Sequence, residues 1–476
     1  MTVRRLLVLA ALPMALAALP IRAGALAADD PASDRVLTLF TNGLGQVWES
    51  RPLAPSAGPR EVVLTGISNR ALAETLRISG AGGNLSVLEM SLNRDILTPH
   101  ALLKRNLGRE VGIIKVHPTT GEERIVKATV LALEGGPVLR VGDHIETGMP
   151  DRLALPDDTF GLPPRPTLTA RLDAGADVRA LDLTYLSEGL AWSADYTAVL
   201  SPDGTGLDLE AWATLANQTE VSFPMARLQL VAGTVNRTAR APQPMLMMAR
   251  GAAKAEAMAA DAGSAPLPQR EASGELHVYT VAGTVALNAG EQKQVALLRA
   301  AAVPATETLI SAGHPQVFGA MRGEARPDHP VVEVSFVNKD LATGGLPLPA
   351  GLLRVYRERP GATPLFSGED RLSDTPAGET ARLTIGRAFD VTVTREQTAF
   401  KRLDAQGRNV EAAFRIILKN GRERVARVRV DENIPGDWEV TETSSSPQRV
   451  AGQARWTLDV PARGETVLTY TVRVLR

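Results

Sequence analysis

The sequence predicts an all-β protein of several domains, in which β-sandwiches dominate, one small barrel of the Sm or SH3 type is inserted, and helix is scarce. Two observations support this prediction. Apolar and polar residues alternate over many short stretches, and a period of two is typical of strands with one buried face. Turn-forming residues separate these stretches at intervals of roughly 8–12 residues, a spacing typical of sandwiches and barrels. Long runs with a helical period are almost absent.

The first residues have the layout of a bacterial secretory signal. Arg4 and Arg5 form a basic start, an apolar run follows from Leu6 to Pro20, and Ala25-Leu26-Ala27 supplies small residues at the cleavage site. The apolar run is shorter than the ~20 residues that a membrane-spanning helix needs. We therefore expect residues 1–27 to be a signal peptide and the mature chain to be periplasmic or secreted. The arginine pair leaves open whether export is general secretory or twin-arginine.

The composition limits the chemistry and the partners. None of the 476 residues is a cysteine, which excludes disulfides, thiolate catalysis and cysteine-ligated metal sites. The formal net charge of −1 gives no electrostatic reason to expect nucleic acid as a partner. After the signal, no stretch of the sequence is apolar over the length that a membrane span needs. We expect no cofactor, no nucleic-acid partner and no integral membrane span after cleavage.

Residues 28–99 are expected to form an N-terminal β region, and residues 100–155 a small barrel. In the second of these stretches the helical pattern of Ala101–Leu107 precedes five short strand patterns. These are Glu110–Val116, Arg124–Leu133, Pro137–Val141, His144–Thr147 and Arg152–Leu155. A helical turn before five strands resembles Sm- and SH3-like barrels. Sm proteins bind RNA, but eight Lys and Arg against seven Asp and Glu between residues 101 and 155 disfavour that use here.

Two connectors divide the remaining chain. Residues 156–166 contain four prolines and are expected to be a stiff connector. Residues 238–274 are rich in Ala, Pro, Gly and Met, with few side chains suited to a core, and are expected to be a mobile linker. A β-sandwich part at 167–237 precedes this linker, and a C-terminal β-sandwich region at 275–476 follows it.

Residues 190–200 bring together aromatic and polar side chains that invite comparison with an active site. Every even position there is apolar, including Trp192 and Tyr196, whereas the odd positions include Ser193 and Asp195. The alternation predicts a half-buried strand with the aromatic rings in the core and the polar groups facing water.

Several long motifs resemble one bacterial family, the domain of unknown function 4139. They include LTYLSEGLAWSADY at 183–196, LVAGTVNR at 230–237 and the stretch from Leu348 to Leu403. The resemblance covers nearly all of the mature chain and implies an exported, mostly β protein. It brings no catalytic residues with it. The long coiled coil of mucoidy-inhibitor-like relatives is missing from this sequence, so any function tied to that coil is not expected here.

Local motifs of catalysis are absent from the sequence: there is no Gly-x-Ser-x-Gly elbow, His-Glu-x-x-His pair, phosphate loop or calcium loop. One candidate site is a polar strand face, with Asp390 and Glu396 on one side and Arg395 on the other. Paired carboxylates are suited to acid–base chemistry. A solvated face with cross-strand ion pairs is the favoured interpretation.

A second candidate site is a group of methionines in the predicted linker, at Met245, Met247, Met248 and Met258. Thioether sulfurs can bind copper(I). Because no histidine or cysteine lies among them, we favour an adaptable apolar contact surface and predict no metal site.

Two classes of function therefore remain. The first is a non-catalytic envelope protein, a binding or structural module whose partner is another envelope protein or a surface glycan. The alternative is a hydrolase whose site is assembled from separate strands. The absence of local motifs favours the first, whereas a deep pocket with convergent carboxylates or histidines would favour the second.

Overall fold

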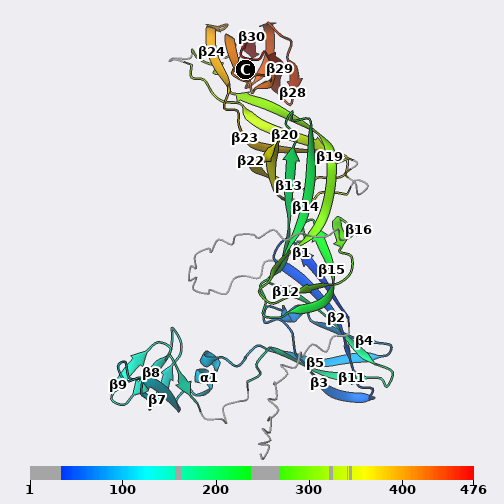
Figure 1. The fold of residues 1–476 in the computed structure, drawn as a ribbon, viewed down its shortest axis with the longest axis vertical. Helices are drawn as coiled ribbons and strands as arrows, with labels where there is room; N and C mark the ends of the chain where they lie inside the picture. Colours follow the sequence, from blue (N-terminus) through cyan, green and yellow to red (C-terminus); the bar gives the residue numbers. More distant parts are fainter. Residues whose placement is uncertain are drawn as a thin grey trace, which may run out of the picture. The chain divides into compact units, whose positions relative to one another are not determined.

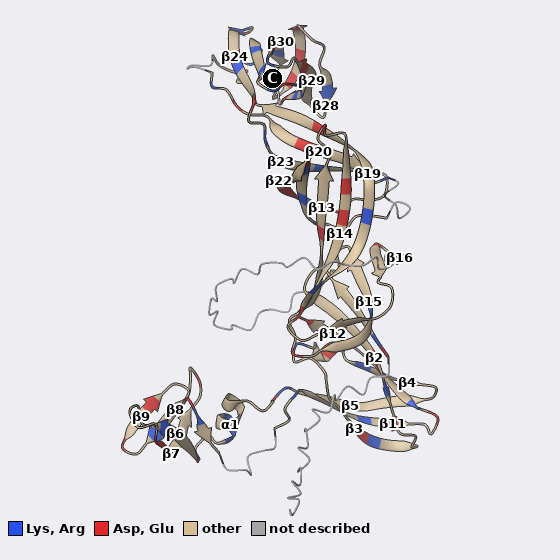
Figure 2. Cartoon of the chain, viewed as in Figure 1, with Lys and Arg blue, Asp and Glu red and all other residues tan. Residues whose placement is uncertain are grey.

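The structure is a computed structural model, and it shows an all-β protein with several sheets (Figure 1). Strand makes up 62% of it and helix 3%, which confirms the predicted fold class. It describes residues 34–155, 162–236, 269–320, 325–339, 341 and 346–475. In these ranges no helix has the length and apolar character that crossing a bilayer requires. Lys and Arg are interspersed with Asp and Glu along the strands, in keeping with the small net charge (Figure 2).

The chain divides into two compact units. Within the described residues, the first unit comprises Arg51–Ile67 and Gly80–Ala180. Part of it is a three-stranded antiparallel sheet in the order β3-β11-β5. Its strands are β3 (Gly58–Leu64), β5 (Leu85–Asn93) and β11 (Thr167–Ala174). The alternating residues Leu168, Ala170 and Leu172 of the central strand are completely buried, as a period of two predicts.

The other part of the first unit is a helix followed by five strands. Thr98 caps the helix α1 (Pro99–Arg105) by accepting a hydrogen bond from the Ala101 amide. The strands are β6 (Glu110–Val116), β7 (Glu123–Ala132), β8 (Val138–Val141), β9 (His144–Thr147) and β10 (Leu153–Ala154). They form one sheet in the order β10-β6-β7-β8-β9, whose buried core includes Leu103 of the helix. Both β6 and β9 have the bounds expected from the sequence.

The second unit begins with a sheet in the order β16-β17-β15-β1-β2-β12-β4, with β18 beside β15. Its elements, together with the short 3-10 helix that precedes β4, are β1 (Asp34–Phe40), β2 (Leu44–Pro52), η1 (Ala73–Thr75), β4 (Arg77–Ala81), β12 (Ala180–Glu188), β15 (Phe223–Ala232), β16 (Gln269–Ser273), β17 (Leu276–Thr280) and β18 (Val285–Leu287). Residues 238–274 are expected to form a linker, and of these the structure does not describe residues 238–268. The next five residues form β16, which pairs with β17.

A ten-stranded sheet continues the second unit, with the main order β22-β21-β13-β14-β19-β26-β29-β28. Its strands are β13 (Leu190–Leu200), β14 (Gly206–Asn217), β19 (Gln292–Gly313), β20 (Val331–Val337), β21 (Gly351–Arg359), β22 (Ala362–Leu372), β23 (Thr380–Arg387), β26 (Ala426–Glu432), β28 (Gln448–Val450) and β29 (Gln453–Val460). Trp192 and Tyr196 of β13 are buried, and their polar atoms donate to the carbonyls of Val231 and Pro349. This confirms that the aromatic cluster belongs to the core.

The C-terminal sandwich is completed by a four-stranded sheet in the order β24-β25-β30-β27. Its strands are β24 (Val391–Arg402), β25 (Val410–Asn420), β27 (Asp437–Thr443) and β30 (Glu465–Leu475). Side chains of this sheet and of β26 and β29 share one apolar core. Asn420-Gly421, a pair typical of two-residue hairpin turns, stands at the end of β25, but no hairpin forms there. Neither residue has a positive φ, and β25 pairs with β24 and β30, whereas β26 belongs to the other sheet.

One local contact occurs three times in the second unit. Asn217, Asn338 and Asn420 are buried at or directly after the end of a strand, and each side-chain amide donates to two consecutive carbonyls of a later turn. The carbonyl pairs belong to Leu287 and Asn288, to Thr375 and Pro376, and to Val460 and Pro461. We call these the asparagine–turn contacts. They satisfy backbone oxygens that a buried turn would otherwise leave without a donor.

Candidate functional site

A cavity of about 420 Å³ opens at one end of the core of the C-terminal sandwich. Its walls come from β24, β25, β26 and β30 and from the segment that follows β19. The residues that line it are His314, Pro315, Gln316, Ala320, Arg395, Phe414, Ile416, Glu432 and Tyr470. The cavity combines an apolar floor with a few polar groups, which is the usual composition of a ligand site.

Glu432 is the acidic residue of the cavity, and the alternation of β26 places it there. Ala426, Val428 and Val430 are buried on the core face of this strand, and Glu432 falls on the same face, completely buried. Gly313 lies opposite it in the parallel pairing of β19 with β26. A Cβ atom at Gly313 would lie 2.5 Å from Arg395 Nε and even closer to the carboxylate. A glycine is therefore required at this position for the carboxylate to fit.

The Glu432 carboxylate is held by two donors. Arg395 Nε donates to Oε1 over 2.7 Å, and the Tyr470 hydroxyl donates to Oε2 over 3.2 Å. Burial raises the pKa of the Glu432 carboxyl, and the Arg395 guanidinium opposes this shift. Burial and the nearby Glu432 carboxylate raise the pKa of Tyr470 well above its ordinary value, so this phenol keeps its proton and remains a donor.

Arg395 is itself fixed by a second set of contacts. Its Nη2 donates to the backbone oxygen of Ser311 over 3.0 Å and to the Ser311 hydroxyl over 2.9 Å. Its side chain is 20% exposed and lines the cavity. The guanidinium therefore joins β19, β24 and β26 at the wall of the cavity, and Nη1 makes no hydrogen bond within the described residues.

Aromatic rings form the floor next to this charged group. The Tyr470 ring lies between Phe414, whose centroid is 5.2 Å away, and Trp456, whose centroid is 4.9 Å away. Phe414 and Tyr470 face each other in the register of β25 and β30. Such ring contacts favour a rigid arrangement, and they orient the Tyr470 hydroxyl toward Glu432.

The three residues of the polar strand face expected from the sequence, Asp390, Arg395 and Glu396, lie in different surroundings in the structure. Asp390 is exposed just before β24, and its backbone oxygen accepts a hydrogen bond from Gly421. Glu396 lies on the other face of β24 from Arg395, across from Arg415 of β25. The three residues thus do not form one site, because only Arg395 reaches the cavity.

Sequence reasoning missed Glu432, although a signal for it exists. In the stretch ARVRVDE at 426–432, the glutamate has the same parity as the three apolar residues before it. An acid on the apolar face of a strand indicates a buried charge that needs a partner. What the sequence does not show is that the partner is Arg395, from a strand 37 residues earlier in the chain.

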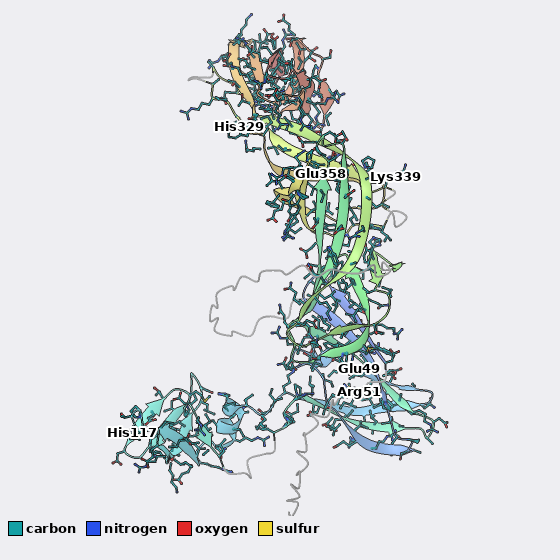
Figure 3. The ribbon with its side chains drawn as sticks, viewed as in Figure 1. Glu49, Arg51, His117, His329, Lys339 and Glu358 are labelled. Atoms are coloured by element: carbon teal, nitrogen blue, oxygen red, sulfur yellow. The ribbon has the colours of Figure 1, made fainter. Side chains whose placement is uncertain are left out.

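The second candidate site, the four methionines at 245, 247, 248 and 258, lies outside the described residues. His117 is in the turn after β6, where its ring accepts from the amides of Thr119 and Thr120, and His329 lies just before β20 (Figure 3). In the part of the chain that the structure describes, no three metal-binding side chains come together.

The cavity lining holds a single carboxyl group within the described residues. Among the residues that line the cavity, Glu432 is the single carboxylic acid, and both of its oxygens already accept hydrogen bonds. Glycosidic hydrolysis typically needs two carboxyl groups. Beside this carboxyl group, the cavity presents the Arg395 guanidinium and an apolar surface.

Comparison with known proteins gave one result. A family model described as Domain of unknown function (DUF4139) matches residues 181–475. This range contains every residue that lines the cavity and all three asparagine–turn contacts. A comparison with curated proteins found no match.

Proposed function

The chain belongs to the DUF4139 family, and from this premise we propose that it is an exported, non-catalytic binding protein of the cell envelope. The cavity of the C-terminal sandwich is its binding site in this proposal. The observation that supports it is the group of Glu432, Arg395 and Tyr470 at the wall of an open cavity. The partner is a segment of an envelope protein or a surface glycan.

The energetics of the charged group support a role in recognition. A buried ion pair contributes little net stability, because removing both charges from water costs about as much as their attraction returns. Apolar residues of similar size at positions 395 and 432 would fill the core equally well. A pair that contributes little to folding, and that faces a cavity, is best explained by what it binds.

A hydrolase remains the second candidate, and one observation favours it. The raised pKa of Glu432 is a property of general acids. The lack of another acid among the cavity residues speaks against it. Hydrolysis of any bound glycan or peptide that stops in Glu432→Gln would favour the enzyme over the binding protein.

The binding site can be tested with arrays of bacterial surface glycans and of short peptides from envelope proteins. We expect the mature chain to bind a subset of these probes, and Glu432→Gln to weaken that binding about tenfold or more, as loss of a charged hydrogen bond predicts. Glu396→Gln is the matched control, because it makes the same substitution on β24, on the face opposite Arg395. Equal binding by both variants would overturn the assignment of the site.

Export is part of the proposal and has a separate test. We expect the protein from the periplasmic or extracellular fraction to begin at Ala28. N-terminal sequencing checks this. Recovery of the chain with residues 1–20 intact in an integral membrane fraction would contradict it.

A further inference from the structure

A second charged cluster, made of Glu307 and three arginines, shares no residue with the cavity. Arg357 of β21 pairs with Glu307 Oε2. Arg422 Nη1 and Arg424 Nη2, from the loop between β25 and β26, each lie 3.6 Å from Oε1. Three guanidinium groups around one carboxylate leave two positive charges in excess. We call these four residues the arginine cluster.

The cluster is partly buried, so solvent screens its excess charge only in part. The Glu307 side chain is 10% exposed, and those of Arg357 and Arg422 are 26% and 21% exposed. Arg424 is the most open member, at 48%. Charges at this depth interact more strongly than charges in bulk water, and like charges need a counter-charge.

Arg357 carries a donor that the described residues leave without an acceptor. Its Nη2 bonds to Glu307, whereas its Nη1 is buried and has no hydrogen-bond partner within the described part of the chain. A buried guanidinium N–H without an acceptor is unfavourable. An anion that enters beside Arg357 would accept from this atom and relieve that cost.

Two acids near the loop arginines are engaged elsewhere. The Asp203 carboxylate accepts from the Ser201 hydroxyl and from Thr205 within its own turn, and these bonds lower its pKa to about 2. Its contact with the cluster is through the backbone oxygen, which accepts from Arg424 Nη1. Glu423, between the two loop arginines, pairs with Arg463.

We infer that the arginine cluster is an anion site for a phosphate group. Guanidinium groups match the oxygens of a tetrahedral oxyanion with two parallel hydrogen bonds, and an excess of two positive charges suits a phosphate monoester or inorganic phosphate. Arg357 and Arg424 would donate to the phosphate, and Glu307 holds the three arginines together. The phosphate can be free or carried by an envelope lipid, and both sources share this chemistry.

The test is calorimetric titration of the mature chain with inorganic phosphate at about 0.01 M ionic strength, where the Debye length is about 30 Å. We expect saturable binding. Arg424→Gln should weaken it about tenfold, since a charge-assisted hydrogen bond is lost. Arg427→Gln is the matched control: Arg427 is exposed on β26, pairs with Asp459, and lies outside the cluster, so its loss should leave binding unchanged.

Glu307→Gln supplies a test of opposite sign. It removes a negative charge beside the anion, so binding of phosphate should tighten severalfold, provided that circular dichroism shows a native strand signal. Vesicles with phosphatidic acid identify the source: retention by them that Arg424→Gln abolishes assigns a lipid phosphate, and binding of free phosphate alone assigns a soluble one. Absence of binding to both, or equal loss in Arg424→Gln and Arg427→Gln, would overturn the site. None of these outcomes depends on the cavity.

Discussion

Glu432 lies where the alternation of its strand calls for an apolar side chain, and its ionisation is therefore linked to folding. Burial raises its pKa above the usual value of 4.5, so the folded chain holds this proton more tightly than the unfolded chain does. The contribution of this proton to the free energy of unfolding is fully present below pH 4.5. It is lost as pH rises through the raised pKa of the folded chain.

The matched variant for this linkage is Glu432→Gln, which does not titrate. We expect the free energy of unfolding of the wild type, relative to this variant, to fall as pH rises from about 4.5 toward neutrality. Urea denaturation across that range measures the difference. Glu396→Gln is the matched control, because it makes the same substitution on β24, on the face turned away from Arg395. A difference for Glu432→Gln that stays constant with pH would contradict the assignment.

Gly313 is a second residue whose identity depends on the cavity. In Gly313→Ala the new methyl group would overlap the Arg395–Glu432 pair, so the pair or β19 must shift. We expect a loss of about 1–3 kcal/mol in the free energy of unfolding, as is usual when a filled site receives an extra methyl. Gly206→Ala is the control, because the nearest atom to its Cβ would be 3.7 Å away. Comparable losses in both variants would show that space at Gly313 is not critical.

At the scale of elements, the three asparagine–turn contacts share one backbone feature. The residues Gly290, Gly378 and Arg463 follow the paired carbonyls at the same spacing, and all three have positive φ, at 70°, 84° and 50°. Glycine adopts this conformation without steric cost, whereas an arginine does not. The third turn therefore carries strain that the other two avoid.

Arg463→Gly should for this reason raise the thermal midpoint of the protein, by about 1–2 °C. The substitution also removes the ion pair with Glu423, but both side chains are more than 70% exposed and such pairs contribute little. Differential scanning calorimetry measures the change, and Glu423→Gln isolates the ion pair. A lower midpoint in Arg463→Gly with no change in Glu423→Gln would show that the turn is not strained.

Which features the sequence predicts depends on how local they are. The presence of a strand, and which of its side chains face the core, follow from alternation within about ten residues. The bounds of β6 and the burial of Trp192 could therefore be predicted. The cavity could not, because Arg395, Glu432 and Tyr470 meet only through pairings between strands distant in the chain. A single sequence carries no record of those pairings. The arginine cluster was missed for the same reason.

At the scale of the whole molecule, the helix and five-stranded sheet between residues 98 and 155 form an insertion. In the described residues these strands pair only with one another. The chain enters and leaves at neighbouring points, since the Leu97 amide donates to the Pro163 carbonyl over 2.9 Å. Such close ends are typical of insertions that a host fold tolerates.

Excision of residues 99–161 with a short Gly-Ser joint should therefore leave the rest of the protein folded. We expect the urea midpoint of the C-terminal sandwich, followed by Trp fluorescence, to match that of the full chain. Phosphate and array binding should persist as well. Collapse of the strand signal in circular dichroism after excision would show that the inserted part is needed for the remainder to fold.

The 22-residue strand β19 has a mechanical consequence. Its first half is hydrogen-bonded to β14 and its last residues to β26, so one uninterrupted backbone belongs to both the central strands and the C-terminal sandwich. Tension along β19 would pull parallel to the strands of both pairings, with β14 and with β26. Many hydrogen bonds would then have to break together rather than one after another. A pulling force transmitted along β19 would thus act in shear on both sets of hydrogen bonds at once.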